Sequence, residues 1–95
     1  MEWFERTKSY EADLIADLNQ IVKIPSILDP NTQSDRTPFG VDMARALAKM
    51  EELAARDGFR YGRVDNMVTW IEYGPADAAE TVAILTHIDI VPAGE

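Results

Sequence analysis

The residues best suited to chemistry lie in the last nine positions, from His87 to Glu95. His87 is the only histidine of the chain, and Asp89 follows it two positions later. A neutral imidazole is a common zinc ligand. In an extended segment, residues i and i+2 project to the same side, so Asp89 can orient the ring of His87. On spacing alone two interpretations stay open, a metal ligand with its orienting carboxylate and a hydrogen-bonded structural histidine.

No other arrangement in the sequence indicates a catalytic site. The chain has no glycine-rich phosphate loop, no Gly-x-Ser-x-Gly elbow and no His-Glu-x-x-His pair. Ser26 follows Pro25 and has no base near it in sequence, so we interpret it as structural. Carboxylates within the expected helices should lie on solvated faces, so the candidate site rests on His87 and Asp89.

Composition narrows the class of protein. The chain is 46% hydrophobic and 27% charged, which is typical of a globular protein. Its formal net charge of −8 disfavours nucleic acid and anionic membranes as partners. There is no cysteine for a disulfide or a thiolate metal site. The first residues lack the layout of a signal peptide, and no apolar run is long enough to span a bilayer, so we expect a cytoplasmic protein.

Hydrophobic periodicity predicts two helices. The first runs from Trp3 to about Ile24 and ends before Pro25. The second begins between Pro38 and Val41, with Thr37 as its cap, and ends at the Asp57-Gly58 pair. Each helix carries an apolar stripe that is expected to face the core. The stripes are Tyr10, Leu14, Leu18, Ile21 and Val22 in the first helix, and Met43, Leu47, Met50 and Ala54 in the second.

After Gly58 the pattern changes to that of strands. Segments 59–64 and 67–73 are predicted as an antiparallel pair joined by the turn Asp65-Asn66. Residues 81–86 are apolar on both faces, as in the middle of a helix-covered sheet, and predict a third strand. The expected fold class is α/β, in the order α-α-β-β-β with a mixed sheet. His87 and Asp89 would then follow the carboxyl end of the third strand, where open α/β sheets bind ligands.

The identity of several segments adds a family resemblance. The string from His87 to Glu95, HIDIVPAGE, resembles the first metal-ligand motif of the M20 metallopeptidases. It is most similar to their bacterial branch of dipeptidase V-like or Xaa-His dipeptidases. Four further segments resemble that branch, namely 18–26 (LNQIVKIPS), 37–40 (TPFG), 64–66 (VDN) and 71–74 (IEYG). Thr86 stands where the family often has glycine, and Glu95 where this branch often has aspartate.

The resemblance implies a mixed-sheet catalytic domain that holds two zinc ions and hydrolyses dipeptides by metal-activated water. It assigns His87 as a ligand of one zinc, and Asp89 as the catalytic-site carboxylate that orients and polarises the imidazole. The family's bridging aspartate, its glutamate pair and its further ligands lie downstream of this motif. Residues 1–95 would therefore be an incomplete N-terminal segment of the catalytic domain, with no second domain. We expect this segment alone to be inactive, and its unsatisfied strand edges to favour self-association.

Two other functions stay open. One is an M20-type deacylase or desuccinylase of N-acyl amino acids, which shares the histidine motif. The other is a non-catalytic module, either a truncated remnant or a binding domain. The next hundred or so residues of the gene, about a domain's length, would discriminate. A bridging aspartate followed by a Glu-Glu pair favours the enzyme, whereas an immediate stop codon favours the remnant.

Overall fold

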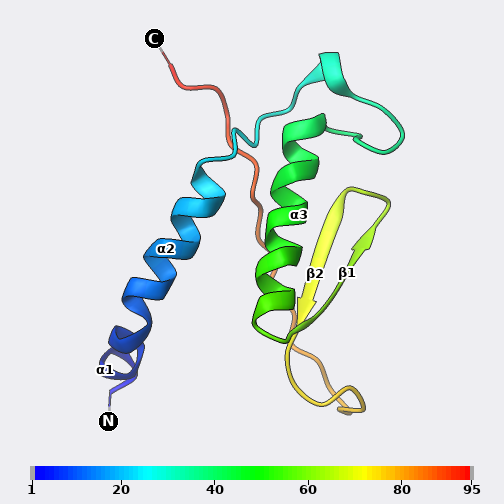
Figure 1. Cartoon of the computed structure of the whole chain (residues 1–95). Coiled ribbons are helices and arrows are strands. Elements are labelled where there is room, and N and C mark those ends of the chain that lie inside the picture. Colours follow the sequence, from blue (N-terminus) through cyan, green and yellow to red (C-terminus); the bar gives the residue numbers. More distant parts are fainter. Residues whose placement is uncertain (1, 95) are drawn as a thin grey trace.

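Helices and a β-hairpin lie side by side in the computed structural model, which describes residues 2–94. Met1 and Glu95, the ends of the expected domain, lie outside the described residues. Figure 1 shows α1 and α2 as an arm that diverges from α3, while α3 lies along the hairpin. In order, the elements are α1 (Trp3–Thr7), a 3-10 turn (Lys8–Tyr10), α2 (Glu11–Val22), a second 3-10 turn (Pro30–Thr32), α3 (Val41–Arg56), β1 (Arg60–Val64) and β2 (Val68–Glu72). Within residues 2–94, no helix is long and apolar enough to cross a membrane.

The small core lies along one side of α3. Three residues of its predicted stripe are buried, Met43, Leu47 and Ala54, and Ala46 between them is 0% exposed. The helix ends where predicted, with Asp57 as its cap and Gly58 in the left-handed conformation at φ 78°. The other buried apolar side chain is that of Ile24, just beyond α2. The sequence pattern of this helix is therefore confirmed in position, in orientation and at its C-terminal end.

The start of α3 differs from the prediction that Thr37 caps it. The N-cap residue is Gly40, whose φ of 101° suits glycine, and its own side-chain position is filled by Asp29, since an added Cβ would lie 2.9 Å from Asp29 Cβ. The hydroxyl of Thr32 accepts a hydrogen bond from the backbone N–H of Val41 at 3.0 Å. Thr37 instead donates its hydroxyl to the Thr32 carbonyl at 2.8 Å. The oxygen that caps the helix thus comes from Thr32, nine positions before Val41, and the local sequence pattern does not indicate this contact.

The first helix is interrupted, and its apolar stripe is not buried. A 3-10 turn separates α1 from α2, and neither helix has a buried residue. Tyr10, Leu14 and Leu18 are 68%, 58% and 47% exposed. The predicted core-facing stripe is wrong for the described residues, because α2 contacts α3 but no other layer covers the rest of its apolar side.

The β-hairpin is confirmed as predicted. Its strands are antiparallel and pair from Arg60 with Glu72 to Val64 with Val68. Asp65 and Asn66 occupy the turn with φ values of 54° and 58°, the positive angles that favour tight hairpin turns. Gly62 pairs with Trp70, and the indole lies where a side chain would be, since a Cβ at residue 62 would stand 2.6 Å from the ring.

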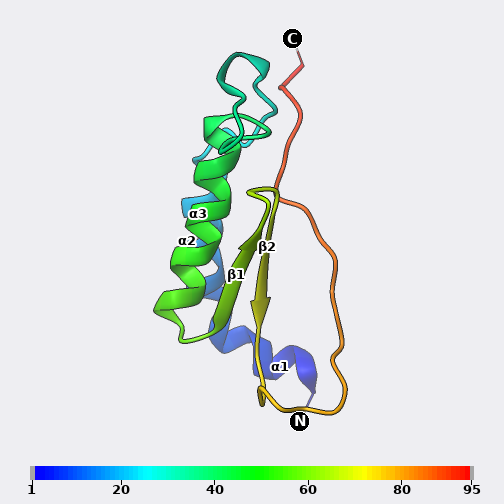
Figure 2. The same cartoon turned by 90° about the vertical axis from the view of Figure 1, so that its right-hand side faces the viewer.

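The predicted third strand is not formed. Residues 81–86 are extended but make no ladder, and Val82, Ile84 and Leu85 are 91%, 88% and 97% exposed. Figure 2 shows the hairpin between α3 and this returning segment, which runs apart from β2. A strand that is apolar on both faces needs neighbours at both edges and a layer on each face. Within residues 2–94 the sheet has two strands, so the mixed sheet is not observed and is a correction to the expected fold class.

A partly buried ion pair fastens α3 to the hairpin. Arg63 donates to both carboxylate oxygens of Glu51, at 2.7 and 2.8 Å, and the Thr69 hydroxyl donates to the same carboxylate at 2.7 Å. The hydrogen bonds from Arg63 are the main reason why the pKa of Glu51 lies below its ordinary value, while burial opposes them in part. One carboxylate thus joins a helix to both strands.

This carboxylate should make stability depend on pH. Because the pKa of Glu51 is lower in the folded than in the unfolded chain, its contribution is present above the unfolded pKa and is lost as pH falls. We expect the free energy of unfolding of the wild type to fall by about 1 kcal/mol more than that of Glu51→Gln between roughly pH 6 and pH 3. Urea unfolding across this range measures the difference, with the exposed Glu52→Gln as the control. Equal pH dependence in wild type and Glu51→Gln would contradict the assignment.

Candidate metal-ligand site

The structure places His87 beside Asp89 in an exposed, extended segment. The ring atom Nδ1 lies 3.1 Å from Asp89 Oδ1 and 3.2 Å from the Asp89 backbone oxygen. Both neighbouring atoms are acceptors, so this geometry favours a ring protonated on Nδ1, with a lone pair on Nε2. The two side chains are 80% and 61% exposed. The imidazole is therefore oriented by a carboxylate and open to a ligand, whereas its metal role and the catalytic role of Asp89 stay predictions.

The segment that carries this pair is held by Ser26. The Ser26 hydroxyl donates to the backbone oxygen of Ile88 at 2.7 Å. The backbone N–H of Ile90 donates to the backbone carbonyl oxygen of Ser26 at 2.9 Å. Asp89 lies between these two attachment points. Ser26 itself is only 3% exposed, so the bonds are shielded from water. The interpretation of Ser26 as structural missed this long-range partner, and no local signal in the Ile-Pro-Ser stretch reveals a contact 62 residues away.

The described residues fit one part of a metal site. The donor set offers an imidazole with its carboxylate, which suits zinc. Within residues 2–94, however, no group of three or more His, Cys, Asp or Glu side chains is placed to hold a metal ion. Catalytic zinc sites use about three protein ligands. His87 fits as a single ligand, and any complete site needs donors from beyond the described residues.

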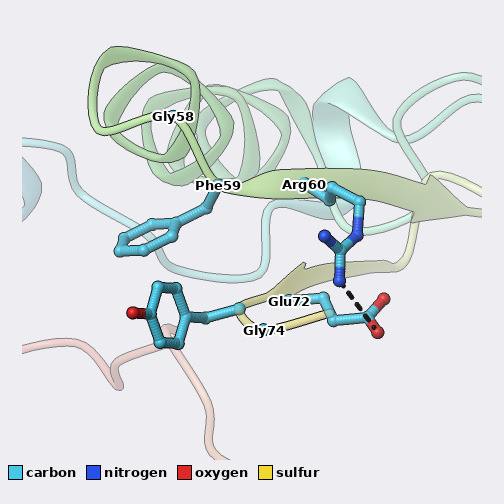
Figure 3. Close-up of a pocket in the computed structure, with 6 residues that line it drawn as sticks. Gly58, Phe59, Arg60, Glu72 and Gly74 are labelled. Carbon is cyan, nitrogen blue, oxygen red and sulfur yellow. Dashed lines mark ion pairs between the residues drawn. The ribbon is translucent and has the colours of Figure 1, made fainter. Parts of the chain in front are cut away.

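A shallow hollow lies at the open end of the hairpin (Figure 3). Phe59 meets Tyr73 edge to face, with ring centroids 5.6 Å apart, and Arg60 pairs with Glu72 at 3.3 Å. Its volume is about 330 Å³. Its charged groups neutralise each other, and none of its lining residues belongs to the His87–Asp89 segment, so it does not form part of the candidate site.

A second hollow, of about 740 Å³, lies where α2 meets the end of α3. Arg56 donates to both oxygens of Asp17, at 2.8 and 2.9 Å, and also to the carboxylate of Asp57. These hydrogen bonds lower the pKa of each aspartate and raise that of the guanidinium. Because the guanidinium is engaged by two carboxylates, one from α2 and one from the end of α3, the cluster joins the two helices and has no cationic group left for a ligand.

Comparisons with known proteins give one consistent relationship. The chain is 40% identical, over 93 residues, to a Staphylococcus haemolyticus protein named "Putative dipeptidase". It is 38% identical, over 93 residues, to a Staphylococcus aureus protein of the same name. Each match covers 98% of this chain but 19% of the relative, so the chain spans about a fifth of the length of the curated relatives it matches. No known family profile matches the chain.

Proposed function

We propose that this chain is part of a dinuclear zinc dipeptidase of the M20 type. In this proposal His87 binds one zinc ion through Nε2, and Asp89 orients the ring through Nδ1. The observation that carries the proposal is the His87–Asp89 contact at 3.1 Å on an exposed segment. The similarity to proteins named as dipeptidases supports dipeptides as the substrate class.

The residues of this chain have defined tasks in such an enzyme. The Asp89 carboxylate accepts the Nδ1 proton, which fixes the tautomer and makes Nε2 a better electron-pair donor. The exposed ring leaves room for ligands from other segments. When bound, zinc would polarise the scissile carbonyl and activate a water molecule. The general base and the remaining ligands would come from polypeptide other than the described residues. Catalysis would therefore need more of the enzyme than this segment.

The substrate separates this proposal from a related one. An N-acyl amino acid deacylase or desuccinylase would use the same histidine, and the names of the relatives favour the dipeptidase over it. A cytoplasmic location and the absence of nucleic-acid and membrane partners belong to the proposal, and the net charge of −8 supports the latter two.

A chimera tests the proposed role of His87. The matching 93-residue segment of the Staphylococcus aureus relative is replaced by the corresponding residues of this chain. We expect this chimera to hydrolyse dipeptides faster than N-acyl amino acids. His87→Ala should lower kcat/KM by about a hundredfold or more and reduce the bound zinc, because a direct ligand is lost. Asp89→Asn should lower kcat/KM by roughly ten- to a hundredfold, because the ring loses its orienting carboxylate.

Asp77→Asn is the matched control, since Asp77 is an exposed aspartate in the turn that precedes the extended segment, outside the proposed site. It should leave both kcat/KM and zinc content unchanged. Full zinc content and full activity in His87→Ala would overturn the proposal. If the chimera hydrolysed N-acyl amino acids faster than dipeptides, the proposed activity would be that of the deacylase instead. The 95-residue chain alone should show no hydrolysis, and hydrolysis abolished by His87→Ala would contradict the incomplete site.

A further inference from the structure

Ser26 makes two hydrogen bonds to residues 88–90 whose pattern resembles that of a one-residue parallel bridge. In a parallel ladder, a residue donates its N–H to one carbonyl of the neighbouring strand and accepts an N–H two residues further along. Ser26 accepts from the Ile90 N–H as such a residue does. Its own N–H is already bonded to the Ile24 oxygen at 2.8 Å, so the hydroxyl donates to Ile88 in its place. A side chain thus supplies the donor that the backbone cannot.

This bridge is the main tether of the segment that carries the candidate site. Among the hydrogen bonds of residues 2–94, the two at Ser26 are the ones that join residues 79–94 to the rest of the chain. One hydrogen bond holds the carbonyl of Ile88, just before Asp89, and the other holds the N–H of Ile90, just after it. The backbone orientation at Asp89, and with it the direction of the carboxylate toward His87, therefore depends on Ser26.

We propose that Ser26 is a positioning residue for the His87–Asp89 pair, acting through the backbone of Ile88 and Ile90 rather than by contact with a metal or substrate. This inference deepens the proposed function and rests on it for its catalytic meaning. Serine suits the task because its hydroxyl is short and reaches Ile88 from a buried position. Alanine would retain the backbone carbonyl that accepts from Ile90 but remove the donor to the Ile88 carbonyl, so the Ile90 bond would open more often, whereas threonine would keep the donor.

The first measurement uses the metal-free 95-residue chain. We expect Ser26→Ala to speed the hydrogen exchange of the Ile90 amide several-fold, and the Hα–Hβ couplings of His87 to move toward rotamer-averaged values. Ser26→Thr should restore both readouts. Ser9→Ala is the matched control, because that hydroxyl donates to the Arg6 carbonyl on the exposed first helix, far in sequence from the site. Unchanged Ile90 exchange and His87 couplings in Ser26→Ala would overturn the positioning role.

The second measurement is zinc affinity in the chimera, by competition with a chelator. Ser26→Ala should raise the zinc dissociation constant roughly tenfold, the effect typical of lost outer support for a ligand, and Ser26→Thr should return it toward the wild-type value. Glu51→Gln controls for a general loss of stability, since it weakens the helix–hairpin contact without touching the segment. It should lower the melting temperature and leave the zinc affinity unchanged.

The outcomes separate the two proposals. If His87→Ala leaves zinc affinity unchanged, the proposed function fails, and the metal-free readouts still decide whether Ser26 orders His87. If His87→Ala abolishes binding but Ser26→Ala binds zinc as the wild type does, the positioning role fails and the proposed function stands. Equal losses of zinc affinity in Ser26→Ala and Glu51→Gln would also overturn the positioning role, because both losses would then follow from lower stability of the fold.

Discussion

Two hydrogen bonds between Ser26 and the backbone of Ile88 and Ile90 are the constraint on which the candidate site depends. The first joins residues that are 62 positions apart, and the second attaches Ile90 of the same segment, so that both sides of Asp89 are held. Two further long-range ion pairs, Glu51 with Arg63 and Asp17 with Arg56, hold α3 to the hairpin and α2 to α3. They do not reach the histidine. Under the proposed positioning role, the orientation of its ring depends on one buried serine.

Local patterns in the sequence predicted the parts of the fold that local interactions determine. The helix α3 and the hairpin were predicted with their ends correct to within a few residues, because a 3.6-residue apolar stripe and a turn with positive φ are encoded in neighbouring positions. Thr37 failed as a cap because the oxygen that accepts from Val41 comes from Thr32, across a loop. Such a contact depends on how the loop folds and leaves no periodic signal.

The failures at residues 81–86 and along α2 share one physical cause. Apolar residues were expected to be buried, and burial requires neighbouring layers as well as an apolar sequence. Leu85 and Leu14 stay exposed because the described residues supply one helix layer and two strands. The site was predictable in part for a similar reason. The approach of Asp89 to His87 follows from alternation within one extended segment, whereas the tether from Ser26 arises only in three dimensions.

In the proposed function, His87 presents an imidazole that Asp89 has already oriented for metal binding. The state of the single His87 ring tests this orientation most directly, because its nitrogen resonances cannot be confused with those of another histidine. At about pH 8.5, ¹⁵N spectroscopy should show the proton on Nδ1 and an unprotonated Nε2. Asp89→Asn should shift the balance toward protonated Nε2. A wild-type ring protonated mainly on Nε2 would contradict the account.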